Sequence, residues 1–153
     1  MIEFSVTPAE LSDARFIIEA NRAMALETEN KELDINVLQK GVQAVLTNPY
    51  HGEYWIAKKA GKPAGCLMIT YEWSDWRNGQ FWWIQSVYVM PEYRRQGVFR
   101  ALFDHIQENA KADYNCCGLR LYVEKSNQRA QNTYASLGMA FTDYDLYELD
   151  FTK

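Results

Sequence analysis

Long apolar runs, basic blocks and low-complexity stretches are all missing from this sequence of 153 residues. Charged residues interrupt each apolar run within about ten positions, well short of the roughly 20 residues needed to cross a bilayer. The start, Met1 to Phe4, has neither the basic residues nor the long apolar stretch of a signal peptide, so we expect a cytoplasmic protein. Because 20 acidic residues exceed 16 basic ones, neither nucleic acid nor an anionic membrane is expected as a partner.

Cysteine is scarce and odd in number, with Cys66 alone and Cys116 beside Cys117. This count favours neither a disulfide framework nor a zinc site, and we expect no metal. Adjacent strand residues point to opposite faces, so Cys116 and Cys117 are interpreted as the half-buried start of a strand. Because GxxxxGK[ST] is absent and no GxGxxG opens a βαβ unit, P-loop nucleotidases and Rossmann dinucleotide enzymes have no support.

The spacing of apolar residues predicts the order β, α, α, β, β, β, α, β, α, β. Thr7, Pro8 and Glu10 are interpreted as the N-cap, first position and capping-box residue of the first helix. An acidic loop, Glu27 to Glu32, is expected between the first two helices. The expected elements are a strand at 2–6, helices from the Thr7 cap to about 26 and from 34 to 46, strands at 54–57, 65–73 and 81–89, a helix at 97–111, a strand at 118–123, a helix at 127–137 and a last strand at 144–151.

Short turns around Gly61 and Gly79 join three of the expected strands into an antiparallel meander. A fully parallel doubly wound sheet cannot contain such turns. The sequence therefore predicts an α/β fold with a mixed, mostly antiparallel sheet flanked by helices on both faces. No repeat or linker divides the chain, so one domain is expected over residues 1–153.

The stretch from Ser86 to Leu102 combines a strand, a basic turn and a helix that begins at a glycine. The first turn of a helix offers free N–H groups and the positive end of the helix dipole. Gly97 permits close approach of the backbone, and Arg94 and Arg95 add positive charge. This arrangement suits a pyrophosphate, although arginines that simply solvate a strand-to-helix loop are an equally ordinary explanation.

Two motifs in this half of the chain resemble those of the GNAT N-acetyltransferase superfamily. In the acyl-CoA motif Arg94 to Val98 match, whereas Phe99 stands where the family has Gly or Ala. The second motif, Asn127 to Met139, is similar to the family pattern Asn-x-x-Ala-x-x-x-Tyr-x-x-x-Gly-Phe, with Met139 in place of Phe. The resemblance covers the predicted elements of essentially the whole chain and implies a GNAT fold.

The resemblance implies an enzyme that transfers an acetyl group from acetyl-CoA to a primary amine. The backbone N–H of Val89 would polarise the thioester oxygen. Tyr134 would protonate the departing thiolate, since a phenol with an unperturbed pKa of about 10 carries its proton at neutral pH and can donate it to a thiolate leaving group whose thiol pKa is about 8.5. By helical spacing alone Tyr134 would be a core residue. The cofactor contacts implied by the family are Val87, Tyr88, Val89, Arg94, Arg95, Gln96, Gly97, Val98, Phe99, Arg100, Asn127, Ala130 and Tyr134.

The general base is left open by the sequence. Many relatives place a Glu near the position of Gln85, and a Gln side chain cannot accept the proton. The remaining candidates are Glu27 or Glu29, Glu72, or a chain of ordered water molecules, each acidic residue being more often a solvated charge. His51 and His105 are weaker candidates, the second interpreted as a residue of the helix surface.

The acceptor is expected to be a small-molecule amine resembling a polyamine or an amino acid. Tryptophans and carboxylates around the turn at Gly79 would suit a cation. Trp82 and Trp83 are expected to point to opposite sides of their strand, one to the core and one to a second copy, since GNAT domains often form homodimers. The alternatives are a protein N-terminal or lysine acetyltransferase, and a non-catalytic acyl-CoA-binding module, favoured by Phe99 and Gln85.

Overall fold

The computed structural model describes residues 3–152 and contains two compact units, Met1–Leu121 and Tyr122–Lys153. The second unit holds the helix α4 (Gln128–Ser136) and the segment that follows it. That the chain forms one domain stays a prediction. The elements of the first unit are β1 (Ser5–Pro8), η1 (Leu11–Asp13), α1 (Ala14–Glu29), α2 (Ile35–Thr47), β2 (Glu53–Lys59), β3 (Lys62–Ser74), β4 (Gly79–Val89), η2 (Pro91–Tyr93), α3 (Val98–Ala112) and β5 (Cys116–Leu121).

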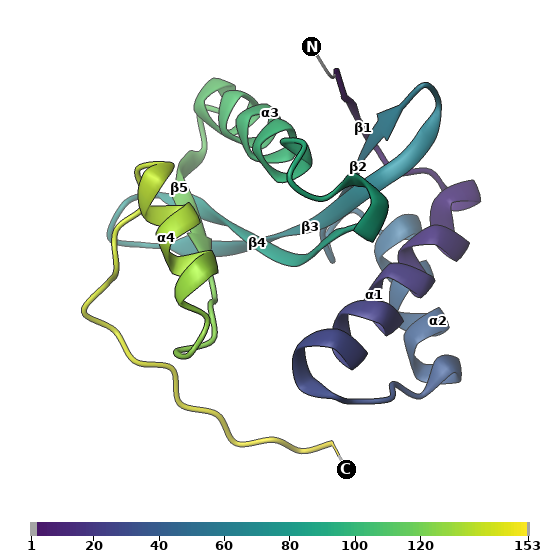
Figure 1. Ribbon diagram of the computed structural model, residues 1–153. Coiled ribbons are helices and arrows are strands. Elements are labelled where there is room, and N and C mark those ends of the chain that lie inside the picture. The colour runs from purple at the N-terminus through teal and green to yellow at the C-terminus, as the bar shows by residue number, and fades with distance from the viewer. Residues whose placement is uncertain (1–2, 153) are drawn as a thin grey trace. The chain divides into compact units, whose positions relative to one another are not determined.

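The sheet of the first unit has five strands in the order β1-β2-β3-β4-β5 (Figure 1). Neighbours from β1 to β4 are antiparallel, and β5 runs parallel to β4. The parallel pair is joined through α3, as a parallel connection requires a crossover. The predicted mixed, mostly antiparallel sheet is confirmed.

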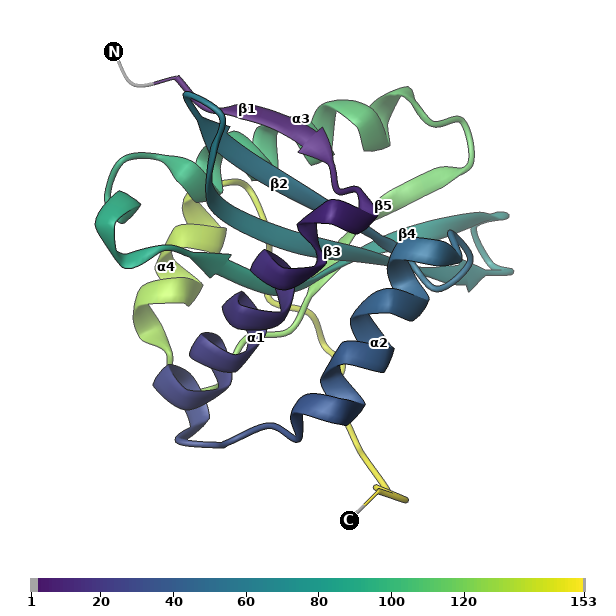
Figure 2. The ribbon, with the colours of Figure 1, turned by 90° about the vertical axis from the view of Figure 1, so that its right-hand side faces the viewer.

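Helices cover both faces of this sheet, α1 and α2 on one side and α3 on the other (Figures 1 and 2). Toward α1 and α2, the strand residues Ile56, Cys66 and Tyr88 pack with Ile17 and Val42. The alternate strand residues point the other way, toward the buried face of α3. No helix within residues 3–152 is both long and apolar enough to span a membrane.

The first helix begins later than the sequence predicts. Thr7 and Pro8 belong to β1, where Pro8 pairs with Trp55 at the end of an edge strand, a position that tolerates a missing N–H. Glu10 instead caps the short helix η1 and donates its backbone N–H to the Asp13 carboxylate at 2.8 Å, and Asp13 is the N-cap of α1. The predicted strand at residues 2–6 is therefore shifted to Ser5–Pro8, and Ile2 lies outside the described residues.

The predicted acidic loop is in part helical. The helix α1 continues to Glu29, so Glu27 and Glu29 lie in its last turn. Asn30 ends the helix in the left-handed conformation, with φ 49°, which asparagine adopts more readily than most residues. The second helix begins as predicted, because the Asp34 side chain accepts hydrogen bonds from the first-turn backbone.

The second unit contains the predicted helix but not the predicted last strand. Asn127 caps α4 by accepting a hydrogen bond from the backbone N–H of Ala130 at 3.0 Å, and Gly138 follows with φ 91°. The expectation of a strand at 144–151 is wrong, since residues 139–152 form neither helix nor strand (Figure 1). A strand forms only on a partner, and the apolar side chains of this segment are exposed.

Candidate functional site

The carboxyl-terminal half of β4 extends past its pairing with β5. The β4–β5 register ends at Ile84 and Leu121, whereas β4 continues to Val89. Opposite β3 the register shifts, so that β4 carries an extra residue, and Ser86 adopts a left-handed φ of 52°. A β-bulge of this kind bends its strand and re-aims the residues that follow it.

The backbone of Val89 faces the edge of β4 that lies away from β3. The next residue, Met90, donates its N–H to the carbonyl of Ala64 at 2.8 Å. Successive N–H groups of a strand point to opposite edges, so the Val89 N–H points to the other side. The Val89 carbonyl lies on that same side, where it accepts a hydrogen bond from Arg94 Nε at 3.0 Å.

A glycine in β3 allows the end of β4 and the start of α3 to approach each other. Gly65 is buried and pairs with Val89. A Cβ at this position would lie 2.8 Å from the Tyr88 carbonyl oxygen and 2.9 Å from Val98 Cγ1. Only glycine fits here without displacement of one of these neighbours.

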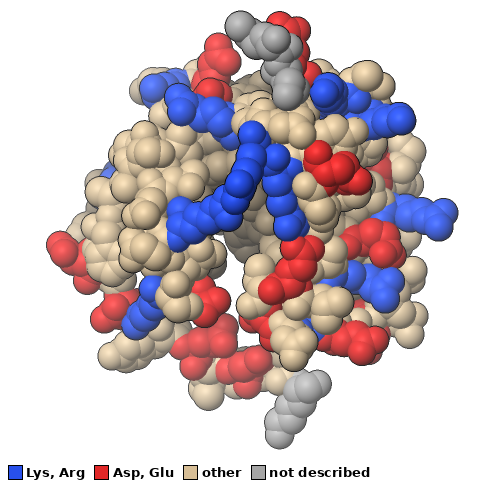
Figure 3. Space-filling model, in the orientation of Figure 1, with Lys and Arg blue, Asp and Glu red and all other residues tan. Residues whose placement is uncertain are grey.

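The loop after β4 leads into a helix whose first turn offers backbone donors. Gly97 is the N-cap of α3 with φ 85°, and Arg95 is also left-handed, with φ 64°. The first intrahelical hydrogen bond runs from the Ala101 N–H to the Gly97 carbonyl, so the preceding N–H groups have no acceptor within the helix. Lys and Arg side chains gather over the start of α3 (Figure 3), where the loop and first turn supply Arg94, Arg95 and Arg100.

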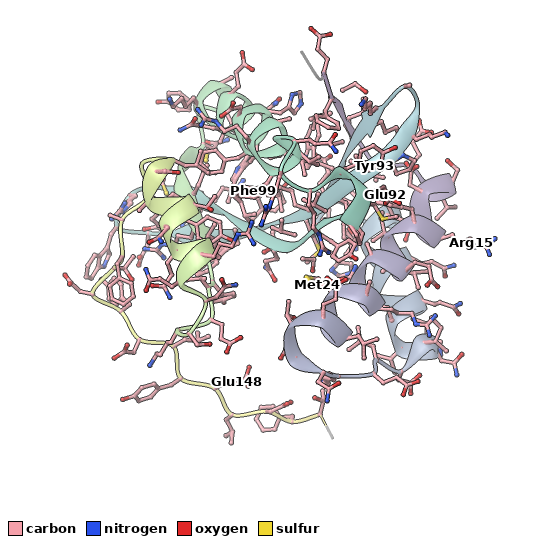
Figure 4. All side chains as sticks on the ribbon, viewed as in Figure 1. Arg15, Met24, Glu92, Tyr93, Phe99 and Glu148 are labelled. Carbon is pink, nitrogen blue, oxygen red and sulfur yellow. The ribbon has the colours of Figure 1, made fainter. Side chains whose placement is uncertain are left out.

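Phe99, in the place of the family's small residue, points along α3 rather than across its end. Its ring centroid lies 6.0 Å from that of the buried Phe103, one turn further along the helix. The side chain is half-buried (Figure 4). The bulky residue therefore packs on the side of the helix, and the first turn keeps its regular geometry.

A carboxylate of α1 joins the end of β4 to the loop before α3. Glu27 accepts hydrogen bonds from the Tyr88 hydroxyl at 2.6 Å and from Arg94 at 2.7 Å. The hydrogen bond from Tyr88, followed by that from Arg94, lowers the pKa of Glu27. Burial and the bond to Glu27 raise the pKa of Tyr88 to about 12. No sequence motif links these three residues, since 61 positions separate Glu27 from Tyr88.

The other acidic candidates lie elsewhere. Glu72 accepts hydrogen bonds from Trp83 Nε1 at 3.0 Å and from Arg120 at 2.8 Å, which commits it to a contact between β3, β4 and β5. Gln85 donates its side-chain amide to the Thr70 hydroxyl. Glu29 is exposed on the last turn of α1. Of the three glutamates considered, only Glu27 contacts the end of β4.

The histidines and tryptophans largely serve packing. His105 is half-buried on α3, and its ring lies 5.1 Å from that of Trp55 in β2, tilted by 58°. His51 is exposed. Trp82 meets Tyr71 edge to face at 5.9 Å, and Trp83, which points to the opposite face, bonds to Glu72. Both tryptophans of β4 are half-buried, and a role for either in contact with a second copy stays a prediction.

The second unit carries the remaining candidate residues. Tyr134 lies in the middle of α4 and is half-buried, and burial raises its pKa. Asn127 and Ala130 bond to each other as the cap of that helix. These two residues therefore have a structural role in addition to the cofactor contact that the motif implies.

An open strand edge followed by a basic loop and a glycine-capped helix would suit an extended arm that ends in a pyrophosphate, the shape of an acyl-coenzyme A. This class of protein agrees with the comparison to known families. Residues 17–139 match the acetyltransferase (GNAT) family, and the chain belongs to it.

Three relatives illustrate the similarity. A possible acetyltransferase from Clostridium difficile 630, known as a crystal structure, is 46% identical over 100% of both chains, with a TM-score of 0.92. Thialysine N-epsilon-acetyltransferase of Bos taurus is 34% identical over 54% of this chain, and the match spans only about half, 51%, of that relative. An N-alpha-acetyltransferase of Sulfurisphaera tokodaii is 27% identical over 89% of this chain and 80% of its own.

Proposed function

We propose that this protein transfers an acetyl group from acetyl-CoA to the primary amine of a small, amino-acid-like molecule. The observation that carries the proposal is the junction of β4 and α3. There, an unpaired strand edge leads within a few residues to the N-terminus of a helix capped by Gly97. The strand edge can pair with the amides of the coenzyme's phosphopantetheine arm, and the helix N-terminus can bind its phosphate end. Both belong to one continuous piece of backbone.

The coenzyme contacts follow from this backbone. Val87 and Val89 offer their outward peptide groups to the amides of the pantetheine arm, as an added strand would. The first-turn N–H groups of α3, from Val98 to Arg100, bind the pyrophosphate, and the side chains of Arg95 and Arg100 add positive charge. Arg94 is already held by Glu27 and by the Val89 carbonyl.

The reaction is a direct aminolysis of the thioester. A neutral amine attacks the acetyl carbonyl carbon, and the Val89 N–H stabilises the oxyanion that forms. The C–S bond then breaks, and Tyr134 donates its proton to the thiolate. Because burial raises the pKa of Tyr134, this phenol stays protonated at neutral pH, as an acid must.

Glu27 anchors the acceptor rather than removing its proton. A carboxylate with a lowered pKa is a weak base, but it remains ionised and attracts an ammonium group. The bonds from Tyr88 and Arg94 hold this charge at the end of β4, close to the Val89 peptide. The proton of the bound amine then leaves through water or through Glu29, the other acidic residue of the same turn.

The choice of acceptor draws on the relatives. Thialysine acetyltransferases act, by their name, on an amine of a small amino acid. The N-alpha-acetyltransferase, which matches over 89% of this chain, favours a second candidate, the α-amine of a peptide or protein. Free amino acids with a side-chain amine and short peptides are therefore the two acceptor sets to compare.

Replacing Glu27 with glutamine should impair binding of the amine more than binding of the coenzyme. The amide keeps a partner for Tyr88 but loses the charge that faces Arg94 and the acceptor. We expect the KM for the amine to rise about tenfold, since hydrogen bonds to charged groups contribute about 1.5–3 kcal/mol. The Kd of acetyl-CoA, measured by calorimetry, should change less than about threefold.

Glu19→Gln is the matched control for this variant. Glu19 lies on the same helix and forms a similar pair with Arg22 at 3.2 Å, away from β4. Its kinetic constants should equal those of the wild type. An equal loss of amine and coenzyme binding in Glu27→Gln would assign Glu27 to the structure of the loop instead.

The function itself is tested by titrating the protein with acetyl-CoA in a calorimeter and then measuring thiol release with a panel of amines. We expect binding, and turnover with amino acids that carry a side-chain amine. Turnover confined to peptides would favour acetylation of the α-amine of a peptide or protein. Binding without turnover on any amine would favour a non-catalytic acyl-CoA-binding module, and absence of binding would refute the proposal.

A further inference from the structure

Methionines gather on the face of the sheet that α1 and α2 cover. Three of the chain's five methionines, Met24 of α1, Met68 of β3 and Met90 after β4, pack against one core cluster, which includes Tyr88. Each of the three is half-buried, so part of each residue remains open to solvent. Together they are called the methionine wall. Methionine side chains are unbranched, flexible and polarisable, which suits a surface on which an apolar ligand lies.

The wall begins next to Glu27, the proposed anchor of the amine. Met24 precedes Glu27 by one turn of α1, so the two side chains lie on the same face of that helix. Figure 4 shows Met24 on the side of α1 opposite to the exposed Arg15. Met90 directly follows Val89. The wall therefore extends from the helix residue beside Glu27 to the residue that follows the Val89 peptide.

The polar side chains that contact Glu27 are engaged within the protein. The Tyr88 hydroxyl donates to Glu27, and Arg94 donates both to Glu27 and to the Val89 carbonyl. A thioether offers no donor and is only a weak acceptor. The α-amine of a peptide stands on a branched carbon next to a carbonyl, which the wall would leave without a hydrogen-bond donor. An unbranched chain of methylene groups brings no polar group to the wall.

We propose that the methionine wall selects an acceptor whose primary amine stands at the end of an unbranched apolar chain. The ammonium group lies at Glu27, where its charge is complementary to the carboxylate, and the methylene groups behind it lie on Met24, Met68 and Met90. This selection presupposes the acetyl transfer proposed above. It narrows the acceptors, because a side-chain amine fits the wall and the α-amine of a peptide does not.

The first test is the dependence of turnover on chain length, measured by thiol release with linear amines from propylamine to hexylamine. We expect kcat/KM to rise about fourfold with each methylene group that the wall covers, since burial of one CH₂ contributes about 0.8 kcal/mol. Hexan-2-amine, which has the same carbons but a branch at the amine, should be used about tenfold less well than hexylamine.

The outcomes of this series separate the selection from the transfer itself. A flat series, or a preference for the branched amine or for peptides, would overturn the selection and leave acetyl transfer in place. Absence of turnover with every amine would refute both.

Variants of α1 test the wall directly. Met24→Gln keeps the length of the side chain but removes its apolar end, and it should lower kcat/KM about tenfold for hexylamine and less than about twofold for propylamine. Met24→Leu should retain most of the dependence on chain length. Leu26→Gln is the matched control, because Leu26 is 58% exposed on the same helix and its loss should leave the whole series unchanged.

The Kd of acetyl-CoA, measured by calorimetry, should be that of the wild type in all three variants. A uniform loss across all amines in Met24→Gln, an unchanged series in that variant, or an equal change in Leu26→Gln would contradict the role of the wall.

Discussion

Replacing Tyr134 with phenylalanine is expected to lower kcat about 100-fold, at the lower end of what a positioned general acid contributes. The variant removes only the hydroxyl group and keeps the half-buried ring on α4. Without the phenol, the thiolate must leave unprotonated or take a proton from water. Because the loop before α3 is unchanged, the Kd of acetyl-CoA should stay within about twofold of the wild type.

The comparison variant for this experiment is Tyr114→Phe, in the turn between α3 and β5, where the side chain is 99% exposed. Its kcat should be that of the wild type. Since burial raises the pKa of Tyr134, the acid form persists through the neutral range, and activity should decline only as the pH rises toward that pKa. Equal losses of turnover and of coenzyme affinity in Tyr134→Phe would make Tyr134 a structural residue.

Most of the fold follows from apolar spacing because the sheet is built from local hairpins. The turns at Gly61 and Gly79 join strands that are also neighbours in space, so local signals were sufficient for β2, β3 and β4. The start of the first helix was placed wrongly, because Thr7 and Pro8 fit a helix cap and an edge strand equally well by residue type. Pairing with Trp55 in β2 decides between them, and that contact is not local.

The candidate site was predictable only where it is continuous in sequence. The motif from Arg94 to Val98 predicts an anion-binding loop before a helix, and Gly97 is the N-cap of α3. The contact of Glu27 with Tyr88 and Arg94 depends instead on how α1 packs across β4. No spacing rule connects residues so far apart, so the sequence offered Glu27 only as one of several acidic candidates.

The strand predicted at 144–151 rests on a clear alternation of apolar and acidic residues, but residues 139–152 form no strand. Alternation of Tyr147, Leu149 and Phe151 with acidic residues specifies which face a strand would bury. It does not specify the neighbouring strand.

Gly65→Ala is expected to impair both stability and coenzyme binding. The added methyl group would meet the Tyr88 carbonyl oxygen at 2.8 Å and Val98 Cγ1 at 2.9 Å, so the end of β4 and the first turn of α3 must move apart. Overpacking of this kind costs about 1–3 kcal/mol of unfolding free energy. Because the same movement separates the Val89 peptide from the pyrophosphate site, the Kd of acetyl-CoA should rise about tenfold or more, equivalent to about 1.4 kcal/mol.

Gly41→Ala adds the same methyl group but is expected to raise, not lower, the free energy of unfolding. Gly41 lies in the middle of α2, is exposed, and has no atom within 4 Å of the position of an added Cβ. Alanine there should raise the unfolding free energy by about 0.5–1 kcal/mol through helix propensity and leave the Kd of acetyl-CoA unchanged. Denaturant titration and calorimetry of both variants separate the two effects. If Gly65→Ala loses stability but binds acetyl-CoA normally, the close approach of β4 and α3 serves the core alone, and the coenzyme must bind elsewhere.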